Sequence, residues 1–509
     1  MLKLRSLVIF VAAIAVGLVP LTNSAAAPTG PRRLTLAYGA IPTTGDPAYD
    51  TNALAMDAYD AVFDTLVVFQ DGKLGPSVAG SWKATSATEW EFKLRRDVKF
   101  HNGEPLNAAA VKFSLERILN PANRIPWLTQ LGPISKIDAI DTYIVRITTV
   151  EPVATLAENL LIAYLVPPRY FQEVGRERFA REPIGSGPFK FKEMNPLTHF
   201  TITAFPESWR WDGKKPGVEE VTWKKLPEDA TRIAAYRARE VEIADSVPPE
   251  QANRLRAAGA KIVSQPIAQT LSINLRSTWD TPLKHKKVRQ ALNYAVDKES
   301  ILKNILIGHG TLSEGQIIGS DAFGYNPNLK AYPFDLQKAR QLLSEAGYAN
   351  GFEMTYHASQ GRYPKDKEVS EVVAAQLAQV GVKAKIEYLE NAVFSQMSRD
   401  GTIGPLNIYG WQYMPAMDIS QPIPFFTCKT PRKNFCDPNL DEAINTMLSE
   451  MDPVKRLRKA QILGGIMRDT APVIFLWQFH SVYAIQPYVK DYVPTTARRA
   501  DLTRVSIDK

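Results

Sequence analysis

The clearest structural signal lies in residues 352–390, FEMTYHASQGRYPKDKEVSEVVAAQLAQVGVKAKIEYLE. Residues 352–359 form a short apolar run that is typical of a strand, and residues 366–381 carry valines at helical spacing. Apolar and charged residues then alternate through 382–390, which predicts a second strand with one buried face. The stretch therefore reads as strand, helix and strand.

The same alternation continues beyond this stretch. Residues 391–401 fit another helix and residues 405–411 another strand, so the segment as a whole reads βαβαβ. Strands joined by helical crossovers run parallel, with right-handed connections. In open α/β sheets ligands collect beyond the carboxyl ends of the strands. We therefore expect the segments 360–365 and 411–418, which follow the first and third strands, to lie at one binding rim.

Four side chains in these two segments are candidates for ligand binding. Arg362 offers a forked donor for a carboxylate, Trp411 and Tyr413 offer stacking surface, and Asp418 could receive an ammonium group. Each has a structural alternative. Arg362 could pair with Asp366 one helical turn later, Trp411 could pack in the core, and Asp418 could cap a helix.

The N-terminus has the pattern of a secretory signal peptide over residues 1–27. Lys3 and Arg5 precede the apolar run LVIFVAAIAVGLVPL and the small residues SAAA. The alternative, a membrane anchor, is disfavoured because this apolar run is short for a membrane span. No cysteine stands near the cleavage region, so we expect a free periplasmic protein and not a lipoprotein.

The length of the chain limits the number of domains, and its charge distribution limits the kinds of partner. The 509 residues suggest about three domains or lobes. The formal net charge is +8, but basic and acidic residues are interspersed along the whole chain. Nucleic-acid-binding proteins instead concentrate their basic residues in a patch or stripe. We therefore expect no nucleic-acid partner.

The chain has two cysteines, Cys428 and Cys436, which enclose a basic, proline-containing loop. In an exported protein such a pair predicts a disulfide, and closing so short a loop would stabilise the fold by about 2.5 kcal/mol in the chain-entropy model. Two unpaired buried thiols are the alternative. A metal site is disfavoured because no histidine lies near the pair.

Catalytic motifs are missing from the sequence. There is no H-E-x-x-H, and PIGSGPF at 183–189 lacks the G-x-S-x-G spacing of a nucleophile elbow. The six histidines show no paired ligand spacing. We therefore predict a protein that is not an enzyme and that needs no cofactor or metal.

Residues 91–106, EFKLRRDVKFHNGEPL, predict a strand, a turn and the approach to a helix. The apolar residues before the turn alternate with charged ones, and Asn107 can cap the helix that follows. His101 lies at the turn with no second ligand or nucleophile close in sequence. We interpret it as structural.

Five segments together carry a family resemblance. They are LGPSVAGSW (74–82), FKLRRDVKFHNGEPLNAAAVKFSLERI (92–118), PIGSGPFKF (183–191), KHKKVRQALNYAVDKESI (284–301) and FDLQKARQLLSEAGY (334–348). In this order they resemble the peptide and nickel class of extracytoplasmic solute-binding proteins, family 5, which serve ABC importers. The resemblance implies a type II periplasmic-binding-protein fold, with two main α/β lobes joined by crossover strands and an inserted subdomain.

The resemblance also implies a division of the chain and a function. Lobe I would comprise 28–68, 185–275 and 481–509, the inserted lobe II 69–184, and lobe III 276–480. The expected function is capture of di- or oligopeptide-like solutes in the cleft and delivery to a membrane permease, by a protein that acts as a monomer. Alternatives are a non-peptide cargo, such as an opine, an oligosaccharide or a metal chelate, and an exported peptide-binding chaperone.

Further site residues follow from the same resemblance. In relatives the extended ligand runs beside the loop after the first strand, which makes Thr43, Thr44 and Asp46 cleft candidates. LSINLR at 271–276 resembles a crossover strand, so Asn274 and Arg276 are hinge or cleft candidates, with a structural role as the alternative.

In relatives that bind dipeptides, an arginine matching Arg362 grips the ligand carboxylate, and an acid soon after the glycine–tryptophan pair holds its amino group. Met414 stands where that acid is expected, and Asp418 is the next acid along the chain.

Overall fold

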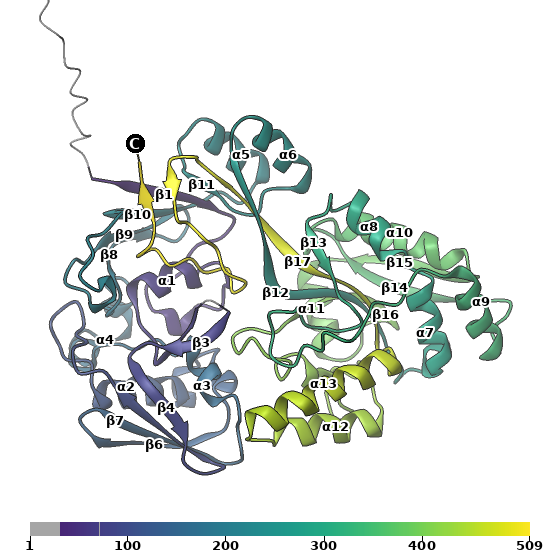
Figure 1. Ribbon diagram of the computed structural model, residues 1–509, viewed down its shortest axis with the longest axis horizontal. Helices are drawn as coiled ribbons and strands as arrows, with labels where there is room; N and C mark the ends of the chain where they lie inside the picture. Colours follow the sequence, from purple (N-terminus) through teal and green to yellow (C-terminus); the bar gives the residue numbers. More distant parts are fainter. Residues whose placement is uncertain (1–30, 71, 509) are drawn as a thin grey trace, which may run out of the picture.

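Two lobes lie side by side and are joined by long strands (Figure 1). The computed structural model describes residues 31–70 and 72–508. The predicted signal peptide, 1–27, lies outside the described residues. No helix of the described part is long and apolar enough to cross a membrane.

One sheet of eleven strands runs through both lobes in the order β15-β14-β16-β12-β17-β11-β1-β10-β9-β8, with β13 beside β17. The half that we call the N lobe contains β1 (Arg33–Tyr38), β8 (Phe189–Asn195), β9 (His199–Ala204), β10 (Glu220–Lys225), β11 (Ile243–Ala244), α1 (Met56–Val62), α5 (Asp229–Arg237) and α6 (Pro249–Ala257). The C-terminal pair β18 (Val489–Lys490) and β19 (Ser506–Ile507) also belongs to it.

The half that we call the C lobe holds the predicted βαβαβ unit. Its strands are β13 (Gly310–Leu312), β14 (Phe352–Ser359), β15 (Val382–Leu389) and β16 (Leu406–Gln412); its helices are α7 (Lys286–Tyr294), α8 (Lys298–Asn304), α9 (Leu336–Glu345), α10 (Asp366–Ala378), α11 (Asn391–Arg399), α12 (Pro438–Leu448) and α13 (Pro453–Thr470). β14 pairs in parallel with both β15 and β16, as predicted. The loops after β14 and β16 therefore leave the same edge of the sheet.

Two strands cross from lobe to lobe, β12 (Lys261–Leu275) and β17 (Val473–Ile485) (Figure 1). They pair antiparallel along most of their length, but the register shifts between Pro266 and Thr270. On the N-lobe side Pro266 faces His480, and on the C-lobe side Thr270 faces Gln478. A bulge bends a strand and increases its twist, and this one lies where the lobes meet.

The inserted subdomain lies beside the N lobe. It contains the hairpin β2 (Val67–Gln70) and β3 (Lys73–Pro76), the sheet of β4 (Ala79–Ala84), β5 (Glu89–Leu94), β7 (Ile144–Thr149) and β6 (Ile134–Asp141), and the helices α2 (Ala108–Leu119), α3 (Leu156–Asn159) and α4 (Pro168–Phe179). The mixed α/β fold with this extra sheet agrees with the predicted fold class. The residue boundaries of the three predicted lobes stay a prediction.

The predicted strand and helix around His101 are present. In β5 the apolar side chains of Trp90, Phe92 and Leu94 are buried, and Asn107 caps α2 by accepting from the Ala110 backbone N–H at 3.2 Å. The His101 ring hydrogen-bonds to the backbone of Gly185 and Gly187. Its place between two segments of the chain agrees with a structural role.

Glycine is required where residues 183–189 pass α1. A Cβ at Gly185 would lie 1.9 Å from the Val62 carbonyl oxygen, and one at Gly187 would lie 2.5 Å from that of Ala61. No side chain fits at such separations. The motif PIGSGPF therefore serves close packing of two backbones, not nucleophilic chemistry.

Candidate functional site

A cavity of about 520 Å³ opens between the lobes. We call it the cleft cavity. The N lobe and the inserted subdomain contribute Thr51, Ala53, Met56, Trp127, Thr129, Gln130, Ile162 and Arg499; the crossover and the C lobe contribute Gln269, Arg362, Tyr363, Tyr409, Gly410, Trp411, Gln412, Met414, Pro415, Gln421, Phe425 and Arg432. Its size lies in the range of small-molecule sites. Because both lobes line it, a bound solute would contact both.

The loops after β14 and β16 meet at this cavity, as the βαβαβ prediction requires. Tyr363 Oη accepts a hydrogen bond from the Gly410 backbone N–H at 2.9 Å. The buried Asp366 carboxylate organises the first loop, because it accepts from the backbone N–H groups of Gly361, Arg362 and Tyr363 at 2.9 to 3.2 Å. The Asp366 carboxylate is therefore occupied by hydrogen bonds from the backbone of this loop.

The Arg362 side chain points away from Asp366 and lies along the cavity wall. Its Nε donates to Tyr363 Oη at 3.0 Å, and its Nη1 donates to Ser395 Oγ at 2.8 Å. The residue is exposed and lines the cleft cavity. The alternative of a side-chain ion pair with Asp366 is wrong, and the guanidinium can receive a carboxylate.

Trp411 packs in the core, which was the alternative considered for it, and a stacking role toward a ligand stays a prediction. Its ring is 2% exposed and packs against Tyr409 and Phe426 at centroid distances of 4.6 and 4.7 Å. Its Nε1 donates to Ser272 Oγ at 2.9 Å. It also lines the cleft cavity. The indole is thus a fixed part of the wall, held by core contacts.

Tyr413 and Asp418 do not line the cleft cavity, which corrects the predictions for both. Tyr413 is fully buried, and its hydroxyl donates to Asp321 Oδ1 at 2.9 Å. Asp418 is 1% exposed and forms a bidentate pair with Arg456, at 2.7 and 2.8 Å. Because that carboxylate is already paired and buried, it is no anchor for a ligand's ammonium group.

The residues predicted as cleft residues in the loop after β1 also have structural roles. Asp46 is fully buried and forms an ion pair with Arg117 of α2. Thr43 donates to Asp50 Oδ2 at 3.1 Å, and Thr44 Oγ1 accepts from the Asp46 backbone N–H at 3.1 Å. None of the three predicted residues lines the cleft cavity; the same loop reaches it a few residues later, at Thr51 and Ala53.

Asn274 and Arg276 are buried in the C lobe, so neither is a cleft residue. Asn274 Nδ2 donates to Asn407 Oδ1 of the paired strand at 2.8 Å. Arg276 donates to three backbone carbonyls, those of Ile403, Gly401 and Arg432, at 2.8 to 2.9 Å. Burial lowers the pKa of Arg276 to about 10. Its role is to hold two loops together.

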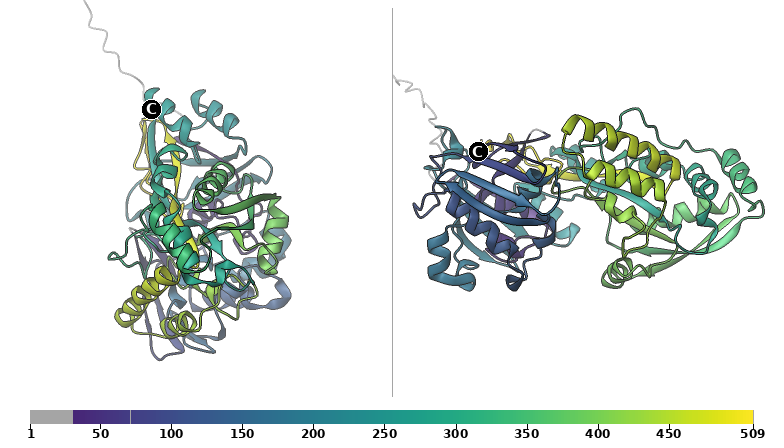
Figure 2. Two further views of the ribbon diagram at one scale, coloured as in Figure 1. Left: turned by 90° about the vertical axis from the view of Figure 1, so that its right-hand side faces the viewer. Right: turned by 90° about the horizontal axis from the view of Figure 1, so that it is seen from below.

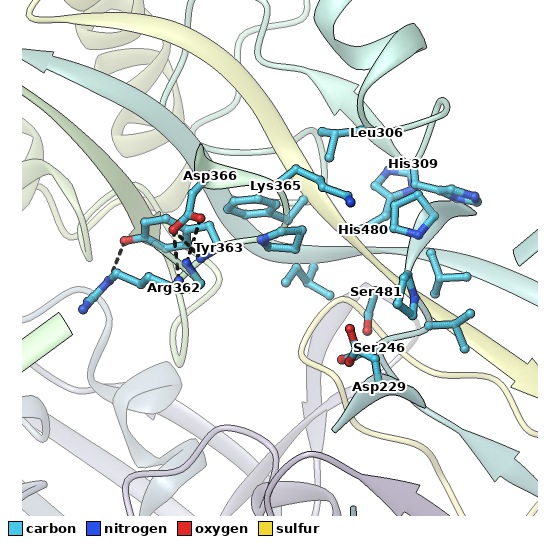
Figure 3. Close-up of a pocket in the computed structure, with 18 of the residues that line it drawn as sticks. Asp229, Ser246, Leu306, His309, Arg362, Tyr363, Lys365, Asp366, His480 and Ser481 are labelled. Carbon is cyan, nitrogen blue, oxygen red and sulfur yellow. Dashed lines mark hydrogen bonds between the residues drawn. The ribbon is translucent and has the colours of Figure 1, made fainter. Parts of the chain in front are cut away.

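A second cavity of about 610 Å³ lies over the crossover strands, and we call it the hinge cavity (Figure 3). It shares Gln269, Arg362 and Tyr363 with the cleft cavity. His309 and His480 line it, and each makes a 2.9 Å contact from its Nδ1 to Ser264 Oγ. Burial lowers the pKa of His480 to about 4 and lowers the pKa of His309 as well.

Several lining residues have no motif that identifies them in the sequence. Tyr409 and Gln269 sit inside strands, Trp127 lies in a loop of the inserted subdomain, and Arg499 comes from the C-terminal tail. Arg432 differs from these residues because it belongs to a segment that the sequence marks, the basic loop between the two cysteines. The fold assembles these residues from segments far apart in sequence.

The loop that carries Arg432 is closed by a disulfide between Cys428 and Cys436. Among the described residues there is no group of three or more histidine, cysteine or acidic side chains that could hold a metal ion. The polar chemistry of the cleft cavity is therefore that of guanidinium, amide, hydroxyl and indole groups.

Comparison with known proteins identifies the family to which the chain belongs. A model of bacterial extracellular solute-binding proteins, family 5 (middle region), matches residues 73–432. The glutathione-binding protein GsiB of Pectobacterium atrosepticum is 33% identical over 361 residues, covering 70% of this chain and 69% of that protein. GsiB of Escherichia coli K12 is 31% identical over 364 residues, with the same coverage of 70% and 69%.

Solved structures have the same architecture. HbpA2 from Haemophilus parasuis is 25% identical with a TM-score of 0.84, covering 94% of this chain and 100% of its own. DppA from Helicobacter pylori in complex with the peptide STSA is 24% identical with a TM-score of 0.75, covering 94% and 98%. These likenesses extend over both lobes, the inserted subdomain and the crossover strands. The chain belongs to family 5 of the bacterial extracellular solute-binding proteins, as a substrate-binding component of an ABC importer and not an enzyme.

Proposed function

We propose that the protein captures a small, acidic, peptide-like solute between its lobes and delivers it chemically unchanged to its importer's permease. One observation carries the proposal. The cleft cavity is lined from both lobes by aromatic side chains and by three arginines, Arg362, Arg432 and Arg499. A forked guanidinium group is suited to a carboxylate, and aromatic walls suit the apolar parts of a peptide.

Capture works by closure of the lobes around the solute. The Lys365 ammonium, on the C-lobe loop, lies 3.5 Å from the Glu250 carboxylate on α6 of the N lobe. The lobes are thus already in contact across the hinge cavity, and Figure 2 shows how narrow the connection between them is when seen from below. A solute that contacts both walls binds the closed state better and so increases its population.

Glutathione is the first solute to test. GsiB, the relative at 33% identity, is named a glutathione-binding protein. Glutathione is a peptide with two carboxylates, which fits a cavity with several guanidinium groups. A second candidate is an acidic non-peptide solute, such as an opine. It is favoured by Met414, an apolar lining residue where relatives that bind dipeptides have an acid for the amino group.

The expected place of action is the periplasm, reached through the signal peptide predicted at residues 1–27, with the protein acting as a monomer. In that setting it would meet the permease at the membrane with its cargo enclosed. The presence of both lobes at the docking surface would let the permease distinguish closed from open protein.

Mass spectrometry of the solute released on denaturing the purified protein tests the proposal directly. We expect a compound with at least one carboxylate, and we expect calorimetry to show binding of the same compound to the emptied protein. Release of an uncharged solute, such as a neutral sugar, that rebinds with high affinity would contradict the acidic cargo. Chemical change of the solute during incubation would contradict simple delivery.

A further inference from the structure

Arg362 and Arg432 differ from the other charged groups at the interface of the lobes. Both line the cleft cavity, and their side-chain hydrogen bonds go to hydroxyl groups: Arg362 to Tyr363 and Ser395, Arg432 to Tyr409 and Ser398. Within 31–70 and 72–508 neither forms an ion pair with a carboxylate. By contrast Arg499, in the same cavity, is paired with Asp60 at 3.1 Å.

The two guanidinium groups stand at opposite ends of a stack of rings. Arg362 lies 5.7 Å from the Phe394 ring centroid, and Phe394 stacks on Tyr409 with centroids 6.5 Å apart and planes 20° apart. Arg432 lies 5.6 Å from the Tyr409 centroid and 4.4 Å from that of Phe425. The rings thus place both cations on the same wall of the cleft cavity, each over an aromatic face.

Arg432 is positioned from behind as well. The Cys428–Cys436 disulfide closes its loop, and buried Arg276 donates to the Arg432 carbonyl oxygen at 2.8 Å. Arg432 Nη1 then donates to Tyr409 Oη at 2.6 Å. A donor fixed before the ligand arrives loses little entropy on binding, so these contacts favour recognition by Arg432.

The cleft cavity, as far as the described residues line it, has no carboxylate for a ligand's ammonium group. Among its described lining residues there is no aspartate or glutamate, and Met414 and Pro415 occupy the segment after β16. Asp418, the next acid, is paired with Arg456. A buried ammonium group without a counter-ion is strongly disfavoured, so an ammonium group of the cargo must keep one of the cargo's own carboxylates beside it, as the α-ammonium of glutathione does.

From these observations we infer that Arg362 and Arg432 form a paired anion site, and that the cargo carries two carboxylates held by these residues. The inference rests on the proposed function and narrows its cargo to peptide-like solutes with two acidic ends. Arg432 is the specificity-determining residue, since a guanidinium at position 362 alone would suit any peptide carboxylate.

Titration calorimetry on the full mature protein, emptied of its solute, tests the inference with two probes. Glutathione carries two carboxylates, and its glycine monoethyl ester carries one. We expect the wild-type protein to prefer glutathione by about tenfold or more, the usual effect of one charged hydrogen-bonded pair. Arg362→Gln and Arg432→Gln should each weaken glutathione binding by a similar factor.

With the ester, only one of the two variants should still lose affinity, because the other arginine has already lost its partner carboxylate. Lys433→Gln is the matched control: it removes the same charge from an exposed neighbour in the same loop and should change neither affinity by more than twofold. Far-ultraviolet circular dichroism shows whether each variant is folded.

Three outcomes decide the matter. Equal affinity for glutathione and its ester, or unchanged glutathione binding by Arg432→Gln, overturns the paired site while leaving an acidic cargo in place. No binding of either probe by the wild-type protein overturns both the paired site and the proposed peptide-like acidic cargo.

Discussion

Asp418 and Arg456 form a buried bidentate ion pair, with Asp418 Oδ1 and Oδ2 accepting from Arg456 Nη2 and Nη1 at 2.7 and 2.8 Å. The pair links the segment after β16 to α13. Both side chains are nearly inaccessible, at 2% and 5% exposed. It therefore belongs to the framework behind the cleft cavity and not to its wall.

Asp418→Ala should lower stability without weakening ligand binding at the cleft. Removing one partner leaves the Arg456 charge buried and unpaired, which costs about 3–5 kcal/mol. We expect the urea midpoint to fall accordingly, while the dissociation constant of the folded variant stays within about threefold of wild type. A selective loss of affinity for solutes with a free amino group would show instead that Asp418 contacts the ligand.

Arg362→Ala should weaken binding of a carboxylate-bearing solute by about tenfold or more, because a charged hydrogen-bonded pair is lost. Stability should change little, since the side chain is exposed and, within the described residues, its hydrogen bonds go to Tyr363 and Ser395. Calorimetry measures the affinity. The control is Arg399→Ala on α11, an exposed arginine whose hydrogen bond goes to Gln396 in its own helix. Equal affinities for Arg362→Ala and wild type would exclude the carboxylate role.

His101 should make the protein less stable in mild acid. Its Nε2 donates to the Gly187 carbonyl oxygen at 3.0 Å, and its Nδ1 accepts from the Gly185 N–H at 3.3 Å, which requires a neutral ring. Burial lowers the pKa of His101 from 6.5 to about 4. Between these values the unfolded chain binds the proton and the native protein does not, so the free energy of unfolding falls as the pH falls.

We expect His101 to account for about 1–2 kcal/mol of lost stability between pH 7 and pH 5. Urea denaturation at the two pH values measures this loss. His101→Gln should be less stable than wild type at pH 7 but should lose less stability on acidification. A variant with the same pH dependence as wild type would mean that His101 titrates normally in the folded protein.

The sequence was sufficient for features that depend on neighbours in the chain. The periodicity of residues 352–411 predicted parallel strands with loops at one rim, and Arg362 indeed lines the cavity there. The cap at Asn107 and the loop between Cys428 and Cys436 are equally local. Each could be predicted because its partners lie a few residues away.

Partners distant in sequence could not be predicted. Asp46 forms an ion pair with Arg117, and Asp418 forms one with Arg456. No neighbouring residue in the sequence indicates which arginine is the partner. The local sequence pattern around a polar loop residue is the same whether that residue faces a cleft or a buried counter-ion. Tyr409 and Arg499 were missed for the converse reason: they reach the cavity only because the lobes bring distant segments together.

Removal of the disulfide should affect binding as well as stability. Replacing both Cys428 and Cys436 by serine opens a short loop and should cost about 2.5 kcal/mol in the chain-entropy model. Because this loop presents Arg432 to the cleft cavity, we expect affinity for a two-carboxylate solute to fall also, by about threefold to tenfold. Calorimetry at a temperature where the variant is folded separates the two effects. Unchanged affinity would show that the loop's other contacts, including the hydrogen bond from Arg276, are enough to hold Arg432 in place.

The Lys365–Glu250 pair should favour the closed arrangement of the lobes. The two groups come from opposite lobes, 3.5 Å apart, and both are partly exposed. Exposed pairs contribute about 0.2–1 kcal/mol, so Glu250→Gln should raise the dissociation constant by no more than about fivefold. It should also enlarge the radius of gyration of the unliganded protein in X-ray scattering.

Glu353→Gln is the matched control, because Glu353 pairs with Lys385 inside the C lobe and cannot affect closure. Since the pair is partly exposed, raising the salt concentration should reduce the difference between Glu250→Gln and wild type. Saturation with solute should contract both proteins to the same dimensions, because the ligand's contacts to both lobes outweigh one surface pair. If scattering gave one radius of gyration for empty and saturated wild-type protein, closure around the solute would be refuted, and with it the role of this pair.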